Sequence, residues 1–126
     1  MKRVFILIAA ALLFGNAQAQ DDAENIQVLP EEAQKCVLPA APDAIPEEAS
    51  YDDLVAAKKQ IATFQEEVIV YRECLQAAEA NPEITEGNKA AIVASFNYTV
   101  EMEERVAERF NVAVRDYKAR KAAAEG

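Results

Sequence analysis

Residues 54–78 read LVAAKKQIATFQEEVIVYRECLQAA, and the spacing of their apolar side chains decides the fold. Apolar side chains recur here at alternating intervals of three and four residues, at Leu54, Ala57, Ile61, Phe64, Val68, Tyr71, Leu75 and Ala78. This spacing is typical of the a/d seam of a coiled coil and places the eight side chains along one side of a helix. Ser50 is a good N-cap with Asp53 three residues later, and Asn81-Pro82 is a turn signal. We therefore predict a helix over about 51–80.

A second seam follows this turn. Its members recur at the same intervals, at Val93, Phe96, Val100, Glu103, Ala107, Phe110, Val114 and Tyr117, with Ile92, Val106 and Ala113 beside them. Either Thr85 or Asn81 can cap this segment, and the pattern predicts a helix over about 84–122. A connection this short makes consecutive helices antiparallel neighbours. We therefore expect an all-α fold in which residues 50–122 form an antiparallel two-helix hairpin with a coiled-coil-like seam.

Charges bear on this hairpin in two ways. Glu103 interrupts the second seam, and it is either a register-setting residue paired with a base such as Lys58, Lys59 or Arg72, or a residue turned to the rim. Antiparallel pairing also brings an acidic set near the start of the first helix beside a basic set at the end of the second. The acidic set is Glu47, Glu48, Asp52 and Asp53, and the basic set is Arg115, Lys118, Arg120 and Lys121. The alternative is that the two sets are solvated independently.

Residues 20–49 have a different composition, which is acidic and contains four of the five prolines: Pro30, Pro39, Pro42 and Pro46. Proline lacks an amide donor and favours extended conformations before it, so we predict an extended, partly disordered strap. The helix over 51–80 also carries a line of mostly apolar residues on the face away from its seam. This back face consists of Val55, Ala56, Ala62, Thr63, Ile69, Val70 and Ala77. We expect the strap to fold back along it and cover it.

The two cysteines of the chain, Cys36 and Cys74, support such a strap. A helix from Tyr51 to Cys74 rises about 35 Å, and the residues from Cys36 to Ser50 reach about 43 Å when extended. The strap is therefore long enough to bring Cys36 to Cys74, and two cysteines in an exported chain indicate a disulfide. A disulfide between two chains and a reactive thiol pair are the alternatives.

The first nineteen residues resemble a signal peptide. Lys2 and Arg3 precede an apolar run over residues 4–14, and Ala17-Gln18-Ala19 is typical of a signal peptidase site. We expect cleavage between Ala19 and Gln20 and a periplasmic or secreted product. The run of eleven apolar residues is shorter than the roughly 20 that cross a bilayer, so we expect no membrane anchor after cleavage. The remaining 107 residues carry 11 bases and 22 acids, a net charge of −11, which disfavours nucleic acid as a partner.

The sequence lacks the residues of most catalytic and metal sites. It contains no histidine and three glycines, so the usual general base, nitrogen ligand and phosphate-binding loop are missing. Cys36 and Cys74 are too far apart in sequence for a CxxC redox pair. Adjacent acids such as Glu66-Glu67 point about 100° apart on a helix and form no catalytic dyad. We expect no catalytic residue, cofactor, metal or small-molecule substrate, and therefore no enzyme.

Several stretches resemble a known group of proteins. They are Phe64 to Leu75 with the ending Tyr71-Arg72-Glu73-Cys74-Leu75, together with Phe96-Asn97, Val100, Met102-Glu103, Val106-Ala107, Phe110-Asn111, Val114 and Tyr117-Lys118. The region from about Cys36 to Arg120 resembles small exported helical-hairpin proteins of alphaproteobacteria, which have no assigned activity. The resemblance implies a helical hairpin with a disulfide and does not imply a function.

These observations favour a non-enzymatic envelope protein. We expect a structural or protein-interaction module that binds a protein partner or itself through the apolar faces of the hairpin, since two helices leave part of their seam uncovered. The alternative is a periplasmic stress chaperone or a weak divalent-cation sensor, in which the acidic helical surface holds clients or ions.

Overall fold

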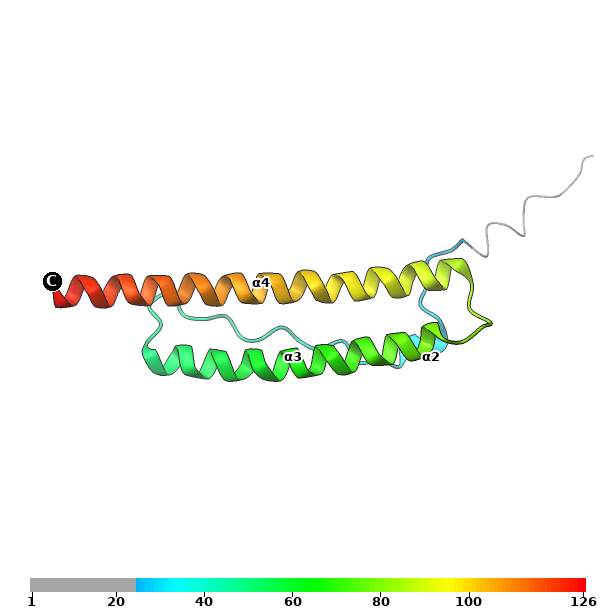
Figure 1. Cartoon of the computed structure of the whole chain (residues 1–126), viewed down its shortest axis with the longest axis horizontal. Coiled ribbons are helices and arrows are strands. Elements are labelled where there is room, and N and C mark those ends of the chain that lie inside the picture. Colours follow the sequence, from blue (N-terminus) through cyan, green and yellow to red (C-terminus); the bar gives the residue numbers. More distant parts are fainter. Residues whose placement is uncertain (1–24) are drawn as a thin grey trace, which may run out of the picture.

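The computed structural model describes residues 25–126, and within this range the fold is all-α, as predicted, with no strand. The helices are α2 (Glu31–Gln34), α3 (Tyr51–Glu79) and α4 (Glu86–Glu125). Helices α3 and α4 run antiparallel, and residues 35–50 lie alongside them as an extended segment (Figure 1). No helix within residues 25–126 has both the length and the apolar character needed to cross a membrane. The predicted signal peptide and its cleavage site between Ala19 and Gln20 lie outside the described residues.

Both long helices begin at capping boxes. The Ser50 hydroxyl accepts a hydrogen bond from the Asp53 amide at 3.1 Å, and the Asp53 carboxylate accepts one from the Ser50 amide at 2.9 Å. Thr85 and Asn88 form the same reciprocal pair at the start of α4, with both bonds at 3.0 Å. Of the two predicted caps, Thr85 is therefore the one used, while Asn81 accepts a bond from the Glu83 amide within the turn. Helix α3 ends one residue before the expected position, and α4 extends from 86 to 125 rather than from 84 to 122.

The first capping box makes stability depend on pH. The Ser50 amide and, to a smaller extent, the Ser50 side chain lower the pKa of Asp53 below its ordinary value of 3.8 by hydrogen bonding to the carboxylate. A carboxyl group with a lowered pKa in the folded state contributes stability above its unfolded pKa, and this contribution is lost as the pH falls through the folded pKa. Between neutral pH and about pH 3, we expect the free energy of unfolding to fall less for the Asp53→Asn variant than for the unmodified protein. Urea unfolding followed by circular dichroism measures this difference, and Asp52→Asn, which alters an acid outside the box, should retain the full loss.

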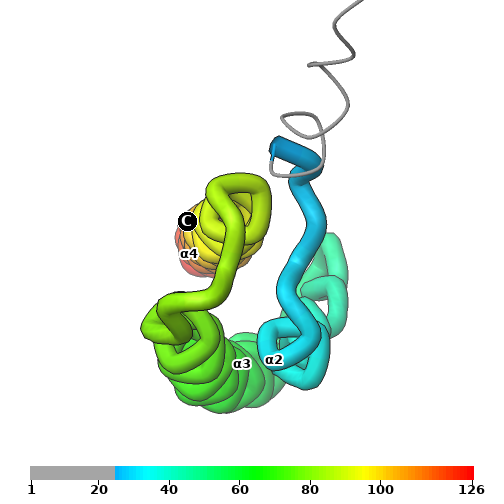
Figure 2. The backbone as a smooth tube through the Cα atoms, turned by 90° about the vertical axis from the view of Figure 1, so that its right-hand side faces the viewer, coloured from blue at the N-terminus to red at the C-terminus, as the bar shows by residue number. Residues whose placement is uncertain are grey.

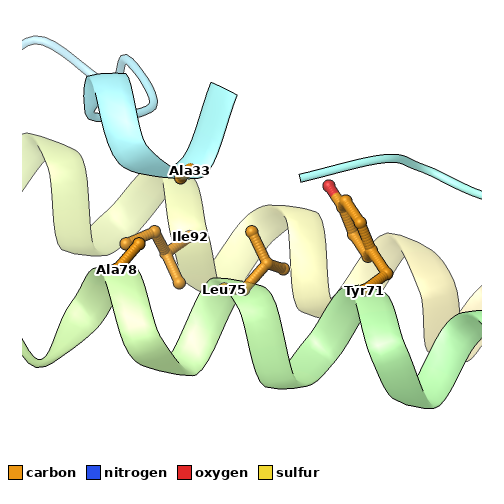
Figure 3. Packing of buried hydrophobic residues seen from close by; sticks show 5 residues of the cluster. All are labelled: Ala33, Tyr71, Leu75, Ala78 and Ile92. Atoms are coloured by element: carbon orange, nitrogen blue, oxygen red, sulfur yellow. The ribbon is translucent and has the colours of Figure 1, made fainter. Parts of the chain in front are cut away.

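Helix α3 contributes the larger share of the core. Six of the eight residues of its predicted seam are buried and the other two, Ala57 and Ile61, are half-buried. One cluster joins the last part of α3 to α2 and α4, with Ala33, Tyr71, Leu75, Ala78 and Ile92 packed together (Figure 3). A second cluster consists of Phe64, Val68, Met102 and Val106. The seam predicted on α3 is thus confirmed.

The seam predicted on α4 is wrong by about one position. The most deeply buried side chains of this helix are Ile92, Thr99, Met102 and Val106, whereas Ala107 is exposed and Val93 is 51% exposed. The cause is the N-terminal segment, which packs on one flank of α4 while α3 packs on the adjacent side. The buried arc of α4 is therefore centred between these two contacts, and the opposite flank is left open.

The N-terminal segment includes a helix that the sequence did not indicate. Residues 25–36 pass from the start of α4 to α2, which lies beside α3 (Figure 2). The Asn88 side chain donates a hydrogen bond to the Val28 carbonyl at 2.7 Å, and Ala33 of α2 is buried against the first cluster. Residues 25–34 therefore have defined contacts in a segment that we expected to be extended and partly disordered.

The expected cover over the back face of α3 is wrong. Ile69 is 53% exposed and Val70 is 65% exposed, and Ala56, Ala62, Thr63 and Ala77 are exposed as well. The segment lies instead in the groove between α3 and α4, where Pro42 and Ile45 line the same small pocket as Ala57, Ile61 and Val106. A chain placed in this groove loses apolar surface to two helices at once, which is more favourable than packing on one.

The predicted pairing of acids and bases takes a different form. None of the ion pairs found among residues 25–126 joins the acidic set near the start of α3 to the basic set of α4. Arg120 donates instead to the backbone carbonyls of Glu47 at 3.1 Å and Ala49 at 2.6 Å. These bonds fix the end of the extended segment to α4 just before α3 begins.

Candidate protein-interaction site

The predicted disulfide between Cys36 and Cys74 is present. The S–S distance is 2.01 Å and the Cα atoms are 5.7 Å apart, so both cysteines of the chain are paired within the chain. The bond ties the extended segment to α3 close to the first core cluster. It therefore anchors this segment at one end of the groove between the helices, while Arg120 holds it at the other end.

The groove on the other side of the helix pair is open. We define the open groove by residues of α4 that face away from the N-terminal segment and by the polar residues opposite them on α3. Its α4 wall is Val93, Phe96, Val100, Ala107 and Val114, and its α3 wall is Arg72, Gln76 and Glu79. A pocket of about 130 Å³ opens into it between Gln76, Val93 and Phe96, and no residue of the N-terminal segment lines this pocket. Within the α4 wall, Val93 and Ala107 are exposed, whereas Phe96, Val100 and Val114 are half-buried and Phe96 also packs against the first core cluster.

Arg72 crosses this groove from α3 to α4. Its guanidinium donates to the Glu103 carboxylate at 2.7 Å and to the Thr99 hydroxyl at 2.9 Å, and it lies 4.8 Å from the centre of the Phe96 ring. The side chains of Arg72 and Glu103 are 20% and 29% exposed. Of the two readings left open for Glu103, the paired one is found. A charge in the seam is thereby neutralised without a neighbouring copy or ligand.

Thr99 is the residue of this cluster that sequence reasoning missed. It is fully buried, and its hydroxyl donates to the Phe96 carbonyl at 2.6 Å while it accepts from Arg72. A threonine within a helix can satisfy its hydroxyl by bonding to a carbonyl one turn earlier, so a polar residue is tolerated here in the core. The signal that could have indicated it is the set of small or apolar residues at 92, 95, 99, 102 and 106, which has the same spacing as the predicted seam.

The Arg72–Glu103 pair should stabilise the fold measurably. We expect Arg72→Ala to lower the free energy of unfolding by about 1.5 to 3 kcal/mol, because it removes a charge-assisted hydrogen bond and leaves Glu103 partly buried without a partner. A double-mutant cycle with Glu103→Gln should give a coupling energy of about 1 kcal/mol. The matched control is the Arg115–Glu108 pair, whose side chains are 66% exposed and whose coupling should be near zero. Equal coupling in the two cycles would contradict the prediction.

A second apolar surface lies on the back face of α3. Val55, Ala62 and Ile69 recur at intervals of seven residues, as do Ala56, Thr63, Val70 and Ala77. Lys59, Glu66 and Glu73 occupy the same face at the same interval, so charges interrupt the apolar line at every second turn. In the predicted seam of α4, by comparison, a charged residue interrupts the apolar line once, at Glu103.

Charged residues do not form a recognisable reaction centre in the part of the chain that the structure describes. No group of three or more histidine, cysteine, aspartate or glutamate side chains is placed there to hold a metal ion. No family model, curated protein or solved structure matches this chain significantly. The arrangement of the groove is therefore the principal guide to what the protein does.

Proposed function

We propose that the protein is a non-enzymatic, exported interaction module, in which a coiled-coil-like hairpin is held by its disulfide-linked strap and binds protein through the open groove. The observation that carries this proposal is the α4 wall of the groove. Val93, Phe96, Val100, Ala107 and Val114 keep the spacing of a helix-packing seam, and all five retain accessible surface, with Val93 and Ala107 exposed. Helical surfaces of this kind bind a further amphipathic helix in many complexes.

The disulfide supports the exported location. Disulfides persist in oxidising compartments such as the periplasm and the extracellular space and are rare in the cytosol. This agrees with the signal-like first nineteen residues and with a net charge of −11 after their removal. Fractionation of the native cells should recover the protein, starting at Gln20, in the periplasm or the medium. Recovery of the full-length chain from the cytoplasm would contradict the location.

The groove is also suited to binding by its rigidity. Arg72 is held by three partners on α4, and the N-terminal segment fixes the opposite side of the helix pair by a disulfide and by hydrogen bonds at both ends. A preorganised surface loses less conformational entropy on binding than a flexible one. A partner helix would bury apolar side chains between α4 and the polar wall of α3.

Site-specific photo-cross-linking in the native cells tests the proposal. A photoreactive amino acid replaces Val93 or Ala107 in the open groove, and the matched control replaces Glu108, which lies on the flank of α4 that faces residues 44–47. We expect adducts of defined mass from position 107 and none of the same mass from position 108. The proposal is wrong if positions 93 and 107 both give no adduct, or if position 108 gives the same adducts.

A further inference from the structure

We infer that the occupant of the open groove is α4 of a second copy of this chain, packed antiparallel about a two-fold axis near residue 105. The inference rests on the groove of the proposed function and names its partner. Three features of α4 carry it: the symmetry of its seam, the distribution of its charges, and the position of Glu103.

The seam that the sequence predicts on α4 is exposed at Val93 and Ala107 and half-buried at its other members, and its spacing is the same in both directions. Its members lie at 93, 96, 100, 103, 107, 110, 114 and 117. Intervals of three and four residues alternate between them, so these positions are arranged symmetrically about residue 105. In an antiparallel pair, each a position of one helix faces a d position of the other. The facing residues are then Val93 with Tyr117, Phe96 with Val114, Val100 with Phe110, and Glu103 with Ala107. Three of the four layers are wholly apolar.

The charges of α4 favour the antiparallel orientation. Residues 86–104 contain four acids and one base, a net charge of −3, and residues 105–125 contain six bases and three acids, a net charge of +3. Antiparallel packing places the negative half of each helix beside the positive half of the other. Parallel packing would place like halves together, which is unfavourable and would select against it.

Glu103 marks the centre of this interface. It lies two residues from the proposed axis, where the two copies of an unpaired glutamate would repel each other. The bond from Arg72 at 2.7 Å neutralises each Glu103 within its own chain. The small side chain of Ala107, which would face Glu103 of the second copy, leaves space for this charged pair. The Arg72–Glu103 pair therefore allows a second copy to pack at the proposed axis, where an unpaired Glu103 would prevent it.

The oligomeric state of the oxidised, mature protein in solution tests the inference directly. Sedimentation equilibrium over a wide range of concentrations should give a monomer–dimer equilibrium. We expect Ala107→Glu to weaken the dimer at least about tenfold, because it adds a charge opposite Glu103 of the second copy. Since Ala107 is exposed in the single chain, this variant should keep its helicity and its monomer fold. The matched control is Val37→Glu, which places the same charge on an apolar side chain that is 82% exposed and lies outside the open groove, and it should leave dimerisation unchanged.

Distances between spin labels show whether the two α4 helices of the dimer pack antiparallel or parallel. Labels at Glu104, beside the proposed axis, should lie close together in the dimer, whereas labels at Lys121 should be about 48 Å apart along the axis at 1.5 Å per residue. A parallel dimer would give short distances at both positions. Short distances at Lys121, a dimer that Ala107→Glu does not weaken, or a monomer at every concentration would each overturn the inference.

These outcomes also separate the inference from the proposed function. A monomer that still forms a groove-specific adduct with a different protein overturns the second copy as occupant and keeps the groove as the binding site. A monomer without any adduct from positions 93 and 107 overturns both.

Discussion

Replacing both cysteines by serine lowers the free energy of unfolding by about 2 to 5 kcal/mol. The bond between Cys36 and Cys74 spans 38 positions in sequence, and on the loop-entropy argument a covalent loop of this length contributes about 4 kcal/mol. The extended segment inside the loop has few other attachments, among them the bond from the Asp43 amide to Gln60 at 3.2 Å. Without the disulfide, this segment leaves the groove between the helices and exposes Ala57 and Ile61.

Thermal and urea unfolding of the oxidised, reduced and Cys36→Ser/Cys74→Ser proteins measure the effect. The reduced protein and the double variant should melt at the same lower temperature, while their far-UV helicity at low temperature stays close to that of the oxidised protein, because α3 and α4 still pack on each other. Adding reductant to the double variant is the control and should change nothing. Intact-mass analysis of the oxidised protein should find no free thiol, and a melting temperature unaffected by reduction would contradict the prediction.

Phe64→Ala should destabilise the protein by about 3 to 5 kcal/mol. Phe64 is 1% exposed and packs with Val68, Met102 and Val106, so its removal takes a large side chain from the contact between α3 and α4 and leaves a cavity. The change also tests the helix pairing, because a pairing in another register would leave Phe64 in contact with different residues or with solvent.

The matched control for this experiment is Ile69→Ala on the same helix. Ile69 is largely exposed, and alanine is a good helix former, so its replacement should change stability by less than about 0.5 kcal/mol. Urea unfolding at constant pH gives both values, with the denaturant dependence of each variant as the check that unfolding remains two-state. Comparable losses from the two variants would show that the buried side of α3 is assigned incorrectly.

Sequence alone predicted α3 in detail because its information is local. The Ser50 capping box and the seam from Leu54 to Ala78 depend on residues within one or two turns of each other, and the helix forms where they indicate. The disulfide was also predictable, because two cysteines in one chain allow a single internal pairing and the intervening residues are long enough to make it. These predictions needed no knowledge of how the helices pack.

The path of residues 37–50 and the buried side of α4 could not be predicted in the same way, because each depends on the other. Pro42 and Ile45 lie against Val106, Met102 packs with Phe64 and Val68 of α3, and Val93 and Ala107 are left exposed. The sequence of α4 contains two adjacent lines with the spacing of three and four, the predicted one through Val93 and Ala107 and the buried one through Ile92, Thr99 and Val106. The choice between them is made by tertiary contacts, in which the Thr99 hydroxyl and Arg72 also take part.

Two smaller features were missed for similar reasons. Helix α2 is only four residues long and begins after Pro30, and it is held by the burial of Ala33 against α3 and α4 more than by its own sequence. Arg120 was expected to pair with carboxylates, but it reaches the backbone carbonyls of residues 47 and 49. Exposed carboxylates gain little from pairing, whereas carbonyl groups next to a helix start need a donor when they approach a neighbouring helix.

The position of the disulfide in the sequence permits one particular order of folding. Cys36 and Cys74 both precede α4, so in an oxidising compartment the ring of residues 36–74 can close before α4 has docked. Helix α4 would then dock onto α3 after α3 has been covalently joined to the N-terminal segment. The contacts made by α4 then join two parts of lower conformational entropy, and residues 37–50 take their final path between the helices only when α4 docks and Arg120 binds the carbonyls of Glu47 and Ala49.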